Sequence, residues 1–292
     1  MKFKAIIISN PKKDDTIYTY LKSLGMSENY IVNLRKSKEN IKLNNEFAFT
    51  NAKINNKDVL LVNDNPNPRT CILPIDLPLD IVFEDENMLV INKPSFLCSM
   101  PNKMHYENNL AGAIVAYMQS KDKNFVLRIL NRLDKDTQGI VVVAKNAFVY
   151  SQLNTSMKKV YHAVVNGRIE EELEINSPIE TLTDENGKNI MKRIVSANGK
   201  SAITKVKPIK IFQNATLVEL TLIQGRTHQI RVHLASIGHA LIGDELYGEK
   251  SELISHTALV CKQISLINPS TKQPMTFQVE YESEFDNLLK KL

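Results

Sequence analysis

Four of the eleven prolines fall between residues 63 and 80. Proline fixes its own φ angle and lacks a backbone N–H, so a stretch this rich in proline is not expected to continue a helix or a central strand. We interpret residues 63–80 as an extended linker. The 292-residue chain is therefore expected to fold as two units, residues 1–62 and residues 81–292.

The two units differ in charge. Residues 1–75 hold 12 basic and 7 acidic residues, whereas the other 217 residues hold 25 of each, so the whole net charge of +5 lies in the first quarter of the chain. A concentrated positive charge favours a polyanionic partner for that part. The hydrophobic fraction of 43% is sufficient for a packed core, which argues against disorder as the main state.

The composition excludes several classes of protein. No apolar run approaches the roughly 18 residues that cross a bilayer, and the N-terminus is not a credible signal peptide. The three cysteines, Cys71, Cys98 and Cys261, are far apart and odd in number, which argues against disulfides and fits a reducing cytoplasm. No Cys-x-x-Cys, His-Glu-x-x-His or Gly-x-Gly-x-x-Gly occurs, so we expect no metal and no cofactor.

Hydrophobic spacing predicts an α+β fold for the first unit. Residues 14–37 read as helical, with a break at Gly25 and a second helix that starts at Ser27, a good N-cap residue. Short strands are predicted at residues 41–43, 46–50 and 59–62.

The larger unit reads as strand-rich with a few helices, which also favours the α+β class. Helices are predicted over residues 108–120 and 227–237. Strands are predicted as a pair within residues 81–94, then at 140–144, 161–165, 202–210 and 215–224. The run at 140–144 is continuously apolar and is expected to be buried on both faces.

A polar loop, Arg-Leu-Asp-Lys-Asp-Thr-Gln-Gly at residues 132–139, stands directly before that apolar strand. It places Asp134 and Asp136 near Arg132 and Lys135. Spacing alone favours an ordinary turn with solvated charges. The alternative is a carboxylate held beside a guanidinium, an arrangement that keeps an Asp ionised and able to attack carbon.

A second polar cluster is Gly-Arg-Thr-His-Gln-Ile-Arg-Val-His at residues 225–233. Thr227 can cap the helix, and the free amides of the first turn favour an anion such as phosphate. A solvated basic helix face is a plausible alternative for any one residue, but less so for the whole cluster. Metal binding fits poorly, because His228 and His233 are five residues apart rather than four.

Taken together, these segments resemble the RluA/RluD family of RNA pseudouridine synthases. The family pattern His-Arg-Leu-Asp-x-x-Thr-Ser-Gly is similar to residues 131–139, Tyr-x-Ala-x-Val-x-Gly fits residues 161–167, and Gly-Arg-Thr-His-Gln-Ile-Arg-Val-His is matched in full at 225–233. Asn-Lys-Pro at 92–94 and Gly-Asp-x-x-Tyr-Gly at 243–248 are also family-like. The resemblance covers residues 80–282.

The resemblance implies a fold and an RNA-binding arm. Residues 81–292 are expected to form the family's catalytic domain, with a mixed, mainly antiparallel sheet and flanking helices. Residues 1–62 resemble a divergent S4-type RNA-binding domain. Two positions depart from the family pattern, Asn131 for His and Gln138 for Ser. We expect both to alter how the loop contacts RNA.

The resemblance also implies an activity, the isomerisation of uridine to pseudouridine in structured RNA, with ribosomal RNA favoured over tRNA. Asp134 would be the nucleophile, attacking either ribose or base. Arg231 would pair with Asp134 and keep it ionised, and Tyr161 would stack on the flipped uracil and help to remove the C5 proton. The residues expected to contact RNA are Arg132, Lys135, Arg226, His228, Arg35, Lys36 and Lys38.

Two alternatives stand beside this interpretation. One is a non-catalytic RNA-binding or ribosome-assembly protein of the same fold, which the coexistence of Asp134, Tyr161 and Arg231 disfavours. The other is a hydrolase that uses Asp134 and Asp136, two loop carboxylates with no assured geometry for that reaction. We expect a cytoplasmic monomer that binds RNA and no membrane.

Overall fold

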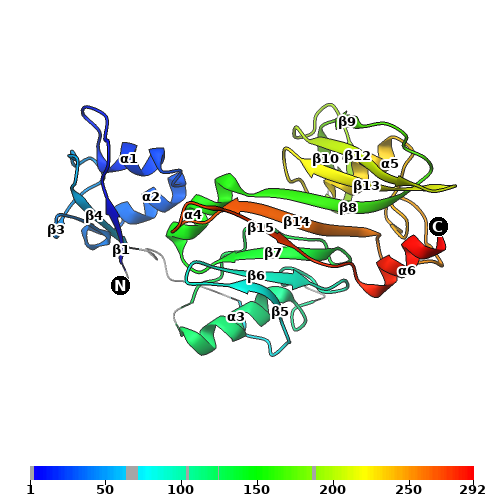
Figure 1. Ribbon diagram of the computed structural model, residues 1–292, viewed down its shortest axis with the longest axis horizontal. Coiled ribbons are helices and arrows are strands. Elements are labelled where there is room, and N and C mark those ends of the chain that lie inside the picture. Colours follow the sequence, from blue (N-terminus) through cyan, green and yellow to red (C-terminus); the bar gives the residue numbers. More distant parts are fainter. Residues whose placement is uncertain (1–2, 64–71, 103–104, 124, 186–188) are drawn as a thin grey trace.

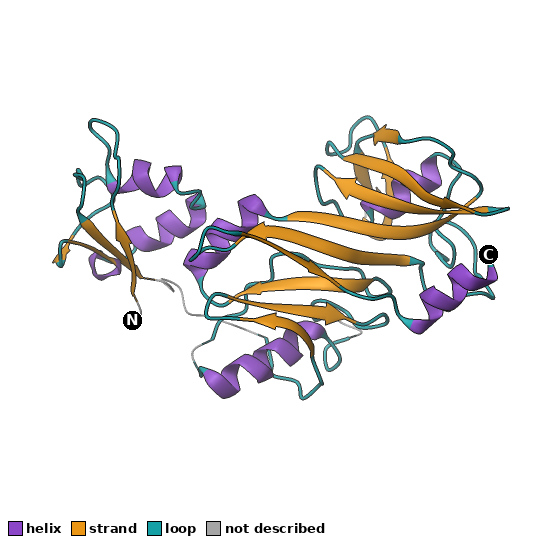
Figure 2. Ribbon diagram, viewed as in Figure 1, coloured by secondary structure: helices purple, strands orange, loops and turns teal. Residues whose placement is uncertain are grey.

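The computed structural model describes residues 3–63, 72–102, 105–123, 125–185 and 189–292. Figure 1 shows a small unit at the N-terminal end and a larger body built around one long sheet, with the C-terminus at the far end of the body. In Figure 2, the helices of the body lie around the edges and faces of that sheet.

The small unit packs two helices against a four-stranded antiparallel sheet of order β1-β4-β2-β3. Its elements are β1 (Phe3–Ile7), α1 (Ile17–Ser23), α2 (Glu28–Arg35), a 3-10 turn (Lys38–Asn40), β2 (Ile41–Leu43), β3 (Glu46–Phe47) and β4 (Val59–Asn63). Thr16 and Ser27 cap the two helices through their side chains, which confirms the predicted start at Ser27. The predicted strands are confirmed, although β3 is shorter than expected, and β1 was not predicted.

The body is built on a sheet of order β5-β6-β7-β14-β8-β13-β12-β9, with β15 beside β14. Neighbouring strands are antiparallel except β7 and β14, which are parallel, so the predicted mixed α+β class is confirmed. The strands are β5 (Asp80–Glu84), β6 (Met88–Lys93), β7 (Gln138–Ala144), β8 (Lys158–Asn166), β9 (Leu173–Asn176), β12 (Ile203–Ile211), β13 (Ala215–Leu222), β14 (Leu259–Ile267) and β15 (Pro274–Gln278).

Four helices and a separate hairpin complete the body. They are α3 (Leu110–Lys121), α4 (Ala147–Ser156), α5 (Gln229–Ser236), α6 (Ser283–Lys291) and the hairpin of β10 (Ile179–Thr183) and β11 (Asn189–Val195). Helix α5 packs against β11 and β12, and α3 lies beside β5 and β6 in Figure 1. The predicted α3 and α5 are confirmed, whereas α4, α6, β9, β10, β11, β14 and β15 were not predicted.

Strand β7 carries the polar loop that precedes it. All seven of its residues are buried, as expected from its apolar run. Gly139 has a φ of +126°, and a Cβ there would lie 2.4 Å from the carbonyl oxygen of Cys261. Only glycine fits this close approach of β7 to β14, so the loop is fixed to the sheet at its C-terminal end.

Helix α4 joins the small unit to the body. Phe148 of α4 is buried in the hydrophobic cluster of the small unit, with its ring edge-on to Tyr30 at a centroid distance of 6.2 Å. The Ser27 N–H donates to the hydroxyl of Ser151. The two units therefore share an apolar contact as well as a covalent connection.

Part of the predicted linker packs on the body. The Ile75 N–H donates to the Gly112 carbonyl of α3 at 3.0 Å, and the Ile75 side chain occupies the space that a Cβ at Gly112 would need. Residues 64–71, with Cys71, lie outside the described residues. Cys98 and Cys261 are buried free thiols. Within the described ranges, no helix has the length and apolar character needed to cross a membrane.

Candidate active site

Asp134 lies in the loop before β7, and the loop is bound to the core around it. The Ser99 hydroxyl donates to the Leu133 carbonyl at 2.6 Å and accepts the Leu133 N–H at 3.0 Å. The Asp134 carbonyl accepts the Thr137 N–H at 3.2 Å, which closes a tight turn. The Asp134 side chain is nevertheless 31% exposed, so a fixed carboxylate remains open to a ligand.

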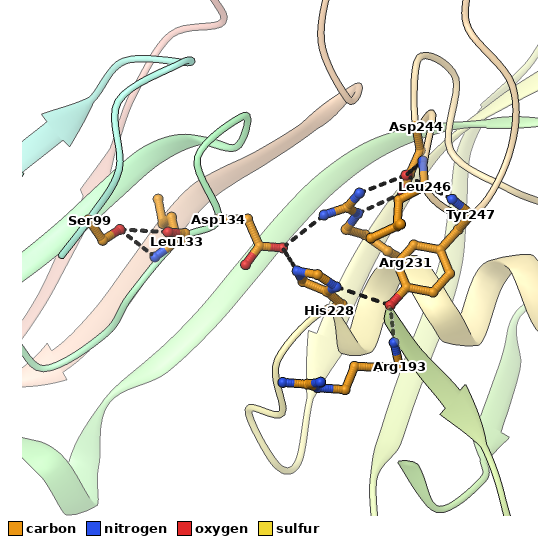
Figure 3. A network of polar contacts seen from close by, with 9 residues as sticks. All are labelled: Ser99, Leu133, Asp134, Arg193, His228, Arg231, Asp244, Leu246 and Tyr247. Carbon is orange, nitrogen blue, oxygen red and sulfur yellow. Dashed lines mark hydrogen bonds and ion pairs between the residues drawn. The ribbon is translucent and has the colours of Figure 1, made fainter. Parts of the chain in front are cut away.

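Arg231 of α5 is the cation that faces this carboxylate. Its Nη1 lies 3.4 Å from Asp134 Oδ2, while its Nε and Nη2 each donate to Asp244 at 2.7 Å. Asp244 is fully buried and also accepts the N–H groups of Leu246 and Tyr247. Burial opposes the charge of Arg231, but Asp244 raises the pKa of the guanidinium above its ordinary value. The structure thus brings together Asp134 and Arg231, and Asp244 orients the guanidinium from its opposite side (Figure 3).

His228 is the second group beside Asp134, with Nε2 3.8 Å from Asp134 Oδ2. Its Nδ1 lies 3.0 Å from the Tyr247 hydroxyl, which itself accepts the backbone N–H of Arg193 at 2.7 Å. A hydroxyl that donates to Nδ1 leaves the proton of a neutral His228 on Nε2. Burial lowers the pKa of His228, and Asp134 only partly opposes this shift. The His228 ring is thus held by Tyr247 with its Nε2 toward the carboxylate.

The start of α5 differs from the prediction. His228 is the N-cap residue, with a left-handed φ of +56° and no capping hydrogen bond from its side chain. The predicted cap at Thr227 is wrong, because the turn aims the His228 ring at Asp134 and the helix begins only at Gln229.

Tyr161 lies on β8, paired in register with Cys261 of β14. Its side chain is buried, and burial raises the pKa of the phenol well above its ordinary value, with further contributions from Cys261 and Asp134. The phenol therefore stays protonated at neutral pH in the absence of RNA.

The predicted RNA-contacting residues fall into two groups. Arg132 and Lys135 are exposed on the loop of Asp134, and Arg226 is exposed just before α5, where its Nε donates to the Ser201 carbonyl at 3.1 Å. With His228, these residues belong to the two segments that meet at Asp134.

The other group lies in the small unit, away from these segments (Figure 1). Lys36 and Lys38 are exposed just after α2, with Lys38 at the start of the 3-10 turn. Arg35 is partly engaged by its own unit, because its Nε donates to Thr50 at 2.9 Å and its guanidinium lies 4.9 Å from the centre of the Tyr18 ring.

Asn131 and Gln138 are structural residues in this fold, and both are buried. Asn131 exchanges hydrogen bonds of 2.8 and 3.0 Å with the backbone of β7. Gln138 donates to the Glu280 carbonyl at 2.9 Å and accepts the Glu282 N–H at 3.0 Å. These side chains bind the loop to the sheet and to the segment before α6, so their expected effect on how the loop contacts RNA would act through the position of the loop and stays a prediction.

The sequence analysis did not single out several residues that hold the groups of the site in place. They are Lys93, Ser99, Asp244, Tyr247 and Arg193. Lys93 is fully buried, and its ammonium donates to the carbonyls of Pro94, Leu97 and Lys135 at 2.8, 2.8 and 3.0 Å. Burial lowers its pKa to about 8. The Asn-Lys-Pro and Gly-Asp-x-x-Tyr-Gly segments contained three of these residues, but the sequence assigned them no role.

No group of three or more His, Cys, Asp or Glu side chains could hold a metal ion in the part of the chain that the structure describes. His233, which shares the polar cluster of His228, is fully buried between Thr204 Oγ1 at 2.9 Å and the Ser177 carbonyl at 2.8 Å. It anchors α5 to the neighbouring strand rather than facing Asp134.

Comparison with known proteins is consistent with this geometry. The family model described as RNA pseudouridylate synthase matches residues 87–236. A protein named uncharacterized RNA pseudouridine synthase YjbO from Bacillus subtilis is 33% identical, over 94% of this chain and 98% of that protein. The ribosomal large subunit pseudouridine synthase D of Zymomonas mobilis is 34% identical, over 82% of this chain and 81% of its own. The solved human RNA pseudouridylate synthase domain containing 4 aligns with a TM-score of 0.56 at 25% identity, covering 72% and 92% of the two chains.

Proposed function

Because this chain belongs to the RNA pseudouridylate synthase family and is an enzyme that isomerises uridine in RNA, we propose that Asp134 is its nucleophile and ribosomal RNA its substrate. The observation that carries the proposal is the exposed Asp134 carboxylate, held on a fixed loop 3.4 Å from a buried, anchored guanidinium. A cation at that distance attracts the carboxylate and holds it in one orientation, as a nucleophile that attacks carbon requires.

The reaction needs only the substrate and this chain. The N1–C1′ bond of uridine breaks, the uracil turns, and a C5–C1′ bond forms; the proton on C5 is lost and N1 gains one, so no oxidant or co-substrate is required. The base must first leave its stack, at a cost of a few kcal/mol. Asp134 attacks either the ribose or the base and leaves again when the new bond forms.

Two groups next to Asp134 have supporting roles in the proposal. Tyr161 stacks on the flipped uracil from the β8 side, since its ring is apolar and its buried phenol stays protonated. Tyr161 can remove the C5 proton only if the phenol is first deprotonated, so this role requires that the bound base lowers the pKa of the phenol. His228 lies where it can contact Asp134, the base or a phosphate, and Lys135 and Arg226 contact phosphates. Arg132 fills or braces the place that the flipped base leaves.

Ribosomal RNA is favoured as the substrate because relatives from Zymomonas mobilis and Neisseria meningitidis carry the name ribosomal large subunit pseudouridine synthase D. We further propose that residues 1–62 act as an S4-like RNA-binding domain before residues 81–292, with Lys36 and Lys38 as phosphate contacts. A cytoplasmic location and a monomeric state stay predictions from the sequence.

The test is pseudouridine formation by purified variants on ribosomal RNA and on tRNA, each isolated from cells that lack the gene. Asp134→Asn should form no pseudouridine and still bind RNA, whereas Asp136→Asn, a change two residues along the same loop, should retain activity. Pseudouridine made by Asp134→Asn would overturn the nucleophile. Activity on tRNA alone would overturn the choice of substrate.

A further inference from the structure

Phe96 is held in an unfavourable backbone conformation with its ring in solvent. Its φ is +63°, and its surface is 48% exposed. Of the eight non-glycine residues with positive φ in the described ranges, Phe96 is the one hydrophobic residue. A bulky residue in this region costs free energy, and such outliers concentrate at functional sites.

The segment that carries Phe96 is fixed to the loop of Asp134. The buried Lys93 ammonium binds the carbonyls of Pro94 and Leu97, on either side of Phe96, and the carbonyl of Lys135, directly after Asp134. One cation thus joins the two loops and holds both backbones in place. Phe96 therefore has a defined position relative to the reacting carboxylate.

One part of the ring is packed and the rest is open. Phe96 lies edge-on to His256, with ring centroids 5.5 Å apart at 87°. The His256 carbonyl lies against Gly243, the residue before the Asp244 that anchors Arg231. The ring thus contacts the segment that packs against Gly243, and about half of its surface is left for another planar group.

We propose that Phe96 stacks on a base of the substrate RNA that neighbours the target uridine. This rests on the proposed function. An exposed aromatic ring gives a sequence-tolerant stacking surface for a base, and exposed Arg132 and Lys135 on the adjoining loop provide the charges that a phosphate backbone requires. Such a contact would favour one arrangement of the nucleotides around the target and so contribute to specificity.

The absence of tryptophan from the chain permits a direct test. Phe96→Trp introduces a single tryptophan, whose fluorescence can be excited at wavelengths that tyrosine does not absorb. Saturating ribosomal RNA from cells that lack the gene, or tRNA if tRNA is the species modified, should quench this emission. Ile267→Trp is the control, because Ile267 is exposed at the last residue of β14, away from Cys261, which pairs with Tyr161. The emission of this variant should change little when RNA is added.

A second variant separates binding from folding. Phe96→Gly removes the ring and suits the positive φ, so its melting temperature should be equal to or above that of the wild type. The RNA dissociation constant should rise at least about 5-fold, with kcat at saturating RNA nearly unchanged. Ile267→Ala should leave the RNA dissociation constant and kcat within about 2-fold of the wild-type values.

The outcomes distinguish this inference from the proposed function. Bound RNA that leaves the emission of the Phe96→Trp variant unchanged, together with an unaltered dissociation constant for Phe96→Gly, would overturn the stacking role while the enzyme still made pseudouridine. Quenching by an added protein fraction but not by the modified RNA would assign the ring to a protein contact instead. Wild-type enzyme that forms no pseudouridine in either RNA would overturn the proposed function and this inference with it.

Discussion

Arg231 is bound to Asp244 by two hydrogen bonds of 2.7 Å but reaches Asp134 through a single contact of 3.4 Å. Asp244 is fully buried, whereas Asp134 is partly exposed. One carboxylate therefore anchors the guanidinium, and the other only faces it. Asp244 therefore holds Arg231 in place independently of the single contact with Asp134, which leaves that carboxylate open to a substrate.

The same asymmetry predicts which carboxylate the fold requires. We expect Asp244→Asn to lower the free energy of unfolding by about 3 kcal/mol, because it leaves the buried Arg231 charge uncompensated. Asp134→Asn should cost less than about 1 kcal/mol, since its ion pair is long and partly solvated. Urea unfolding at pH 7 measures both values. Equal destabilisation by the two variants would mean that Asp134 is also structural.

The local part of the site could be predicted from the sequence. Asp134 lies in a contiguous polar loop before an apolar run, and Arg231 lies in a contiguous basic helix, so each was visible in a short window. Their meeting across 97 residues was implied by the family resemblance and not by spacing.

The supporting residues could not be predicted, because they act across the fold. Lys93 reaches the loop from 42 residues away, and Ser99 from 34. Neither carries a local signal, since an isolated lysine or serine is normally a surface residue. Strand β1 was missed for a similar reason, because its partner β4 lies at the opposite end of the small unit in sequence.

The depressed pKa of Lys93 predicts a pH-dependent stability. The folded protein releases this proton near pH 8, whereas the unfolded chain keeps it until near 10.5, so the unfolded state binds more protons in that window. The contribution of Lys93 to the free energy of unfolding therefore rises with pH. Relative to Lys93→Met, the wild type should gain about 2 kcal/mol between pH 7 and pH 9.5, as measured by urea unfolding. A constant difference between the two proteins would contradict the lowered pKa of Lys93 in the folded state.

The burial of Phe148 in the small unit predicts that this side chain stabilises the small unit against the body. Truncating a buried phenylalanine costs about 3–5 kcal/mol, and this ring packs in the cluster of the small unit although it belongs to α4 of the body. Phe148→Ala should accelerate amide hydrogen exchange in α1, α2 and their sheet while β7 stays protected. Phe285→Ala, which removes a buried ring from α6, should leave exchange in the small unit unchanged. Equal effects of both variants on the small unit would contradict the docking role of Phe148.

The excess charge of the first unit predicts its share of the RNA affinity. Lys36 and Lys38 are exposed just after α2, and each phosphate contact contributes roughly one to the slope of log affinity against log salt. Lys36→Gln with Lys38→Gln should therefore flatten the slope by up to about 2. Lys205→Gln with Lys207→Gln is the matched control, because these exposed lysines of β12 face Glu174 and Glu172 at 3.9 and 3.7 Å. If both pairs flatten the slope equally, the effect follows from net charge and the small unit does not bind the RNA backbone.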